Sequence, residues 1–219
     1  MNNRNYQREL DALITGFEKE NKVPRLFLHS CCAPCSSYVL EYLSQYFKIT
    51  VLYYNPNIYN PNISPKEEYE KRVEEIRRMI GEMNFIHPVK LVEGTYDPQI
   101  FFRMAKGLEQ VPEGGERCFR CYRLRMEEAA KLAKEGGYDY FTTTLSISPL
   151  KNAPKIKSEK NWQRFTERPI FLLISRKKTA TSVPLSCPEN IICTVRITVA
   201  VYFQKETEMN KYAKNILFI

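Results

Sequence analysis

Two groups of cysteines constrain how this chain can fold. Five of its seven cysteines fall in Cys31-Cys32-Ala33-Pro34-Cys35 and in Cys118-Phe119-Arg120-Cys121. The N-terminal residues are polar, so we expect no secretory leader. Thiols gathered in this way in a chain without a leader usually bind a metal or do redox chemistry instead of closing disulfides. A metal–thiolate site is our first hypothesis, and it requires a fold that brings the two groups together.

Short apolar runs alternate with amphipathic segments up to about residue 154. We expect strands over residues 25–29, 49–54, 89–92 and 139–144. Helices are expected from Pro34, from the capping pattern Ser64-Pro65-Lys66-Glu67, over 98–106, and over 122–135 before Gly136-Gly137. This alternation predicts an α/β fold with a mostly parallel sheet and covering helices.

Ligands of parallel sheets gather at the carboxyl ends of the strands. Cys31 and Cys32 come just after the first expected strand, where that rule places a site. Asn55-Pro56-Asn57 and residues 142–148 follow two other strands and offer amide and hydroxyl groups to the same edge. We interpret His29, which precedes the cysteines, as a packed or supporting side chain in preference to a metal ligand.

Size and charge narrow the class of protein. The chain has 219 residues, of which 43% are hydrophobic, and no apolar run approaches the roughly 20 residues of a membrane span. We therefore expect a soluble cytoplasmic protein without a membrane partner. The net charge of +8 divides into +1 for residues 1–154 and +7 for residues 155–219. Beside the second cysteine pair lies a basic patch, interpreted as a phosphate contact or a solvated helix face: Arg117, Arg120, Arg123 and Arg125.

The C-terminal part differs from the rest in composition. All eight glycines precede residue 138, although roughly six would be expected after it at about 7% usage. The run Ile191–Val201 is rich in β-branched residues and resembles an exposed edge strand or a hairpin. We therefore divide the chain into an α/β domain over residues 1–155 and an atypical segment over 156–219.

Cys31, Cys32, Cys118 and Cys121 supply four thiolates, the number that binds an iron–sulfur cluster or a structural zinc. Adjacent cysteines favour iron slightly, because structural zinc more often uses two spaced C-x-x-C pairs. Cys35 is a fifth candidate ligand that could replace one of the four, serve an additional iron, or cap the helix. Cys32 and Cys35 also form a C-x-x-C pair suited to thiol redox chemistry. Small buried apolar cysteines are the remaining interpretation.

At these residues the chain resembles the epoxyqueuosine reductases of the QueH type. The matching segments run in order: Leu28–Ser36, Tyr54–Ile58 with Glu68, Tyr69 and Arg72, Gly115–Arg125, and Thr142–Lys151. The resemblance covers about residues 25–155. It implies a Rossmann-like fold similar to the nucleotide α-hydrolases, with a 4Fe–4S cluster on Cys31, Cys32, Cys118 and Cys121. It also implies reduction of epoxyqueuosine to queuosine in tRNA, with electrons from a donor that the sequence does not identify.

The chain departs from this family near its C-terminus. The resemblance implies a redox-active Cys-Gly-Cys there, but this chain has none, and Cys187 and Cys193 do not match it. No catalytic residue can therefore be carried over. As a hypothesis, residues 157–203 are a frame-shifted reading of the family's C-terminal region. In the shifted frame, the third base of each codon is read together with the first two bases of the next codon. Read in this way, the codons for Thr198–Val201 permit Cys-Gly-Cys.

Two alternatives stay open at this point. The chain could be a zinc-stabilised RNA-binding module without enzymatic activity, or a thiol oxidoreductase that uses Cys32 and Cys35. Iron with acid-labile sulfide would favour the reductase, and stoichiometric zinc without sulfide would favour the binding module. A thiol oxidoreductase should keep its activity after chelation and lose it on alkylation.

Overall fold

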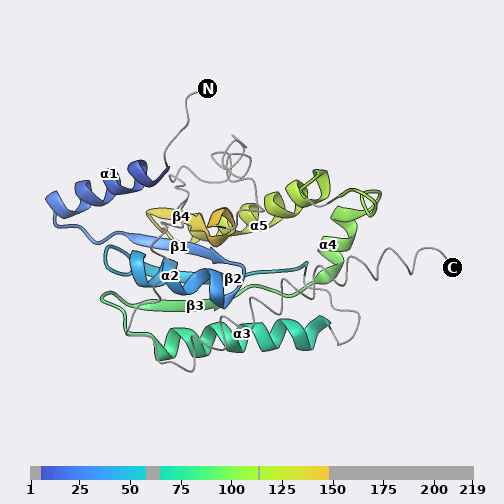
Figure 1. Cartoon of the computed structure of the whole chain (residues 1–219), viewed down its shortest axis with the longest axis horizontal. Coiled ribbons are helices and arrows are strands. Elements are labelled where there is room, and N and C mark those ends of the chain that lie inside the picture. The colour runs from blue at the N-terminus through green and yellow to red at the C-terminus, as the bar shows by residue number, and fades with distance from the viewer. Residues whose placement is uncertain (1–5, 58–64, 113, 148–219) are drawn as a thin grey trace. The chain divides into compact units, whose positions relative to one another are not determined.

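The protein alternates helices and strands in a computed structural model that describes residues 6–57, 65–112 and 114–147 (Figure 1). The elements are α1 Tyr6–Lys19, β1 Arg25–Ser30, α2 Ala33–Leu43, β2 Lys48–Tyr53, α3 Pro65–Glu82, β3 Val89–Glu93, α4 Pro98–Ala105, α5 Glu116–Glu135, β4 Tyr140–Thr143 and the 3₁₀ helix η1 Thr144–Ile147. In this part of the chain no helix is both long enough and apolar enough to cross a membrane.

The four strands form one sheet in the order β3-β2-β1-β4, and every neighbouring pair is parallel. This confirms the predicted α/β class. From β1 the chain first adds strands on one side, and after β3 it returns to place β4 on the other side of β1. Strand order therefore reverses between β1 and β4, which is where open parallel sheets bind ligands. His29 pairs with Thr143, so the carboxyl ends of these two strands are level.

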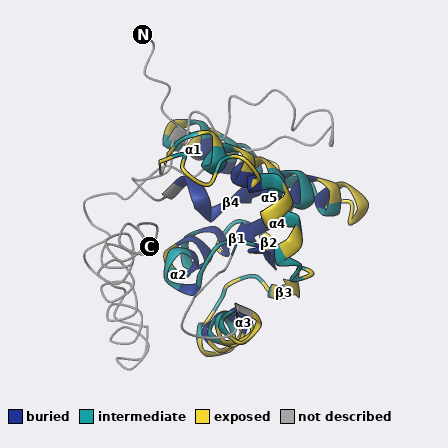
Figure 2. Ribbon diagram, turned by 90° about the vertical axis from the view of Figure 1, so that its right-hand side faces the viewer, coloured by how far each residue is buried: buried dark blue, intermediate teal, exposed yellow. Residues whose placement is uncertain are grey.

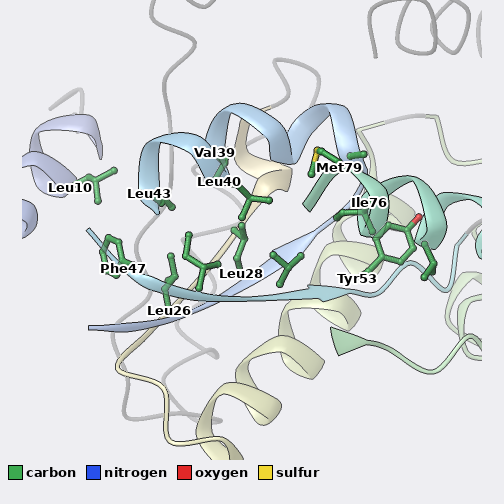
Figure 3. Close-up of a cluster of buried hydrophobic side chains, with 14 of the residues drawn as sticks. Leu10, Leu26, Leu28, Val39, Leu40, Leu43, Phe47, Tyr53, Ile76 and Met79 are labelled. Carbon is green, nitrogen blue, oxygen red and sulfur yellow. The ribbon is translucent and has the colours of Figure 1, made fainter. Parts of the chain in front are cut away.

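Helices cover both faces of the sheet (Figures 1 and 2). Leu26 and Leu28 of β1 point into the core beneath α2 and α3, which also takes residues of α1 (Figure 3). Phe27 points to the opposite face and packs against α5. This alternation follows from the two-residue period of a strand. Because both faces are buried, β1 and β2 consist almost entirely of buried residues, as central parallel strands do.

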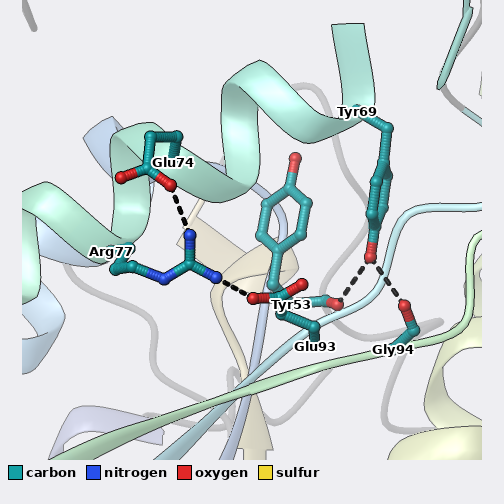
Figure 4. A network of polar contacts seen from close by, with 6 residues as sticks. All are labelled: Tyr53, Tyr69, Glu74, Arg77, Glu93 and Gly94. Atoms are coloured by element: carbon teal, nitrogen blue, oxygen red, sulfur yellow. Dashed lines mark hydrogen bonds and ion pairs between the residues drawn. The ribbon is translucent and has the colours of Figure 1, made fainter. Parts of the chain in front are cut away.

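Polar contacts fasten α3 to the carboxyl ends of β2 and β3 (Figure 4). The Tyr69 hydroxyl lies 2.8 Å from the carbonyl oxygen of Gly94 and 3.2 Å from that of Tyr53. Arg77 of α3 forms ion pairs with Glu74 on its own helix and with Glu93 at the end of β3. These contacts hold the strand ends that precede the loops of the candidate site.

Two helices differ from the sequence prediction. No helix was predicted over Tyr6–Lys19, although Leu10 and Ile14 lie one turn apart and both are buried. The helix expected over 122–135 begins six residues earlier, at Glu116. Gly115 is its N-cap. The carboxylate of Glu116 in the first turn stabilises the helix, because it interacts favourably with the positive end of the helix dipole. As a result, both Cys118 and Cys121 are helical residues.

The four strands and the helix predicted over 98–106 agree with their predicted bounds to within one residue at either end. α2 begins one residue before the predicted Pro34, and α3 begins at the predicted Pro65. Ser64 of the predicted capping box lies outside the described residues. So do the predicted strand Ile191–Val201 and the whole segment from 156 to 219, including the region of the frame-shift hypothesis.

Candidate metal centre

Cys31 and Cys32 follow the last residue of β1 at the point where strand order reverses. The Cys31 amide donates a hydrogen bond to the Thr144 hydroxyl, 3.1 Å away, just past the end of β4. The two sulfurs lie 3.8 Å apart. Cys32 is the N-cap of α2 with extended backbone, but its thiol caps no amide of the helix. The Cys32 thiol is therefore not used to cap the helix.

Cys35, on the first turn of α2, joins this pair. The sulfurs of Cys31, Cys32 and Cys35 all lie within 4.8 Å of one another, close enough to hold a metal ion. Hydrogen bonds with the Cys31 and Cys35 thiols, together with burial, raise the pKa of the Cys32 thiol well above its ordinary value. A metal that binds here would have to displace that proton, because thiolates are the ligands.

Cys118 and Cys121 lie one turn apart near the N-terminus of α5. Cys118 Sγ accepts a hydrogen bond from the Gly114 amide at 3.3 Å. Gly114 has a φ of 80°, a conformation that glycine adopts without strain. Cys121 Sγ accepts from the Arg125 guanidinium, whose Nη2 is 3.2 Å away. Thiolate ligands of metal centres are often held by donors of this kind.

Contacts connect the two cysteine groups across the end of the sheet. Asn55, just after β2, donates through Nδ2 to the carbonyl oxygen of Cys31 at 3.1 Å. Its Oδ1 accepts from Arg125 Nη1 at 2.9 Å. Cys31 and Cys118 also pack against the same apolar cluster beneath α5. The two groups thus lie at one edge of the sheet. The sulfurs of Cys118 and Cys121 are not part of the close three-sulfur group, so the four-cysteine ligand set stays a prediction.

The basic patch needs a correction. Both interpretations of the patch, a phosphate contact and a solvated helix face, place Arg125 at the surface, but it is only 4% exposed and faces Asn55 and Cys121. The four-residue spacing from Cys121 puts it on the same helix face as that cysteine, which the sequence could have indicated. Burial alone would lower the pKa of Arg125, but its proximity to the sulfurs of Cys121 and Cys31 raises it.

The other arginines of the patch are more accessible. Arg120 is exposed and pairs with Glu116 at 3.0 Å, and Arg123 is exposed. Arg117 donates to the carbonyl oxygen of Glu109.

His29 is fully buried and supports the site, in agreement with its interpretation from the sequence. Its Nε2 lies 3.0 Å from the carbonyl oxygen of Tyr54, which can only accept, so Nε2 carries the proton. Its Nδ1 lies 2.8 Å from the Thr143 hydroxyl, which also accepts from the Leu145 amide. Both ring nitrogens are thus occupied by protein groups. His29 fixes the strand ends around the cysteines.

The fold and this site define an α/β protein with thiols gathered where the strand order of a parallel sheet reverses. Residues 26–182 match the family described as epoxyqueuosine reductase QueH, and the chain belongs to that family. The match extends past residue 155, where the resemblance was expected to end.

Three curated relatives, each named epoxyqueuosine reductase QueH, illustrate the likeness. The protein from Staphylococcus epidermidis is 43% identical over 156 residues, covering 69% of this chain and 63% of the relative. The protein from Streptococcus pyogenes is 41% identical, covering 69% and 58%, and that from Staphylococcus aureus is 42% identical, covering 69% and 63%. The chain thus spans about three fifths of the length of these relatives.

Proposed function

We propose that this protein reduces the epoxide of epoxyqueuosine in tRNA to give queuosine, the last step of queuosine biosynthesis. A 4Fe–4S cluster on Cys31, Cys32, Cys118 and Cys121 is the cofactor. The observation that carries the proposal is the convergence of both cysteine groups, through Asn55 and Arg125, at one sheet edge in a member of this family. A tRNA substrate also fits a cytoplasmic location.

The chemistry of the site suits an anionic cofactor. Arg125 is buried, and it has no carboxylate partner among the described residues. A buried cation is costly without a counter-charge. Its nearest candidates are the sulfurs of Cys121 and Cys31, which become negative when they bind metal. Cys31 Sγ also accepts from the Thr144 hydroxyl at 3.3 Å, so the sulfurs of Cys31, Cys118 and Cys121 each accept a hydrogen bond from a group other than a thiol.

The reaction removes an oxygen atom as water and consumes two electrons and two protons. When bound, an iron–sulfur cluster supplies electrons and an iron that can act as a Lewis acid. The four cysteines would hold it, and Cys35 would serve an additional iron beside it. Arg117, Arg120 and Arg123 would contact tRNA phosphates. The electron donor is a separate partner.

The segment over residues 156–219 is expected to affect activity, because it contains no Cys-Gly-Cys. Without that dithiol, we expect this chain to retain iron weakly or to turn over slowly. Sequencing the gene tests the frame-shift hypothesis, because a nucleotide sequence without Cys-Gly-Cys in any frame near codons 198–201 would exclude it. A chain restored to the shifted frame should reduce its substrate faster than the chain as it stands.

Metal analysis of anaerobically purified protein tests the proposal, with a tRNA reduction assay beside it. We expect iron and acid-labile sulfide in similar amounts, lost when any of the four cysteines is changed to serine. Zinc without sulfide would support the RNA-binding module instead. Activity that survives chelation would support the thiol oxidoreductase. Rapid reduction of epoxyqueuosine tRNA by the present chain would contradict the expected impairment by the segment over residues 156–219.

A further inference from the structure

We propose that Arg125 is a positioning residue that, together with Asn55, holds the two cysteine groups in register for the cluster. The inference rests on the cluster site proposed above. It concerns a side chain that contacts a candidate ligand directly and reaches the other cysteine group through one intermediate. The exposed arginines of α5, Arg120 and Arg123, do not share this role, because their side chains face outward.

The guanidinium of Arg125 points in three directions at once. Its Nη1 donates to Asn55 Oδ1 at 2.9 Å, and its Nη2 donates to Cys121 Sγ at 3.2 Å. Its Nε lies 3.5 Å from the carbonyl oxygen of Cys121. A planar, rigid fork can satisfy these acceptors together, whereas the single ammonium of lysine cannot.

Asn55 transmits this arrangement to the first cysteine group. Because its Oδ1 accepts from Arg125, its Nδ2 must face the other way, and it donates to the carbonyl oxygens of Cys31 and Ser30 at 3.1 and 3.4 Å. The amide is buried, so it is held in this orientation. Asn55 and Arg125 are 70 residues apart in sequence, and their contact joins the end of β2 to α5.

Asn55 and Arg125 are both buried, so the loss of either side chain is costly. If one partner is removed, the other keeps a buried polar group without its hydrogen bond. The cysteines that the pair supports would then be free to move relative to each other. Loss of residues that orient metal ligands typically lowers metal affinity about 10–100-fold.

Arg125→Met and Asn55→Ala test the inference in the full chain. We expect each variant to lose iron to a chelator about 10-fold faster or more than the unchanged protein. We also expect the reduction potential of the cluster to fall in Arg125→Met, because a cation beside a ligand sulfur favours the more negative reduced state. Arg120→Gln is the matched control, since it removes an exposed arginine from the same helix.

Two measurements separate positioning from general stability. Thermal unfolding of the metal-free variants reports the structural contribution alone. If Arg125→Met lowers the unfolding temperature but leaves chelator kinetics and potential unchanged, the inference is wrong. If Arg125→Met does not fold, Arg125→Lys keeps the charge and must still release iron faster. The double variant Asn55→Ala/Arg125→Met should release iron no faster than either single variant, because the two residues act as a unit.

Cobalt distinguishes failure of this inference from failure of the proposed function. If the unchanged protein holds no iron–sulfur cluster, Co²⁺ binding can be measured instead. The absorption of the cobalt–thiolate bonds reports it. Weaker Co²⁺ binding by Arg125→Met than by Arg120→Gln would support the positioning role without the cluster. Equal Co²⁺ binding by the two variants would overturn it.

Discussion

The Thr144 hydroxyl lies 3.1 Å from the amide nitrogen of Cys31 and 3.3 Å from its sulfur. It accepts from the first and donates to the second, so one side chain after β4 positions both ends of the cysteine. This is possible because β1 and β4 are neighbours and end level with each other.

Thr144→Val keeps the shape of the side chain and removes these two hydrogen bonds. We expect a loss of about 1–3 kcal/mol in the free energy of unfolding, because the Cys31 amide is left without its partner. Urea denaturation of the metal-free protein measures it. Thr144→Ser should recover most of the loss, and equal stability of the valine variant and the unchanged protein would show that the contact contributes nothing.

Gly94 and Gly81 should respond in opposite directions to alanine. A Cβ at Gly94 would lie 2.6 Å from Cδ2 of Tyr54 and 2.9 Å from its Cβ, whereas a Cβ at Gly81 near the end of α3 meets nothing within 4 Å. We expect Gly94→Ala to lose about 1–3 kcal/mol through overpacking. Gly81→Ala should gain about 0.4–1 kcal/mol from reduced chain entropy. Thermal unfolding of both variants checks the prediction, and a stabilising Gly94→Ala would refute it.

Leu28 should be a major source of stability. It is fully buried in β1 beneath α2. Leu28→Ala should lower the free energy of unfolding by about 2–5 kcal/mol, through lost burial and the cavity that remains. Val92→Ala in β3, where the side chain is 42% exposed, should cost less than about 1 kcal/mol. A comparable loss in both variants would mean that the core is not where we describe it.

Alkaline pH should weaken the fold. Burial raises the pKa of Tyr42 to about 12. Since the folded protein holds this proton more tightly than the unfolded chain, the contribution of Tyr42 is complete below about pH 10 and is lost as the pH rises towards 12. Tyr42→Phe should reduce the decline in stability between about pH 10 and pH 12, measured by urea denaturation. Tyr38→Phe, on the same face of α2, is the control, and an unchanged decline in Tyr42→Phe would contradict the assignment.

Arg123 provides a test of tRNA binding at a residue that is not a candidate cluster ligand. It is exposed on α5. If it contacts a phosphate, Arg123→Gln should weaken binding to all tRNAs alike and lower the salt dependence by about one unit of the log–log slope. Fluorescence anisotropy across a salt series measures both quantities. A change restricted to tRNA that carries epoxyqueuosine would instead indicate a contact to the modified base.

The local parts of the site could be predicted from sequence. Residues 26–28 are apolar and Cys31-Cys32 follow shortly after them, and Pro34 allows a helix to start immediately afterwards. Alternation of strands and helices then implied a parallel sheet with the cysteines at its carboxyl edge. These inferences depend on short-range rules, in which side-chain period and turn residues report the backbone directly. The same rules do not reveal the N-terminal start of α5, where charged residues and Gly115 begin a helix without an apolar repeat.

The sequence by itself determined which thiols exist and which strand Cys31 and Cys32 follow, but not that Cys118 and Cys121 are part of helix α5. Only the tertiary structure decided that Arg125 is buried, that Asn55 contacts both Arg125 and Cys31, and that Thr144 contacts Cys31. The physical reason is that strand order and helix packing set which groups meet across the chain. An arginine has the same local sequence signal whether its helix turns it towards water or towards sulfur.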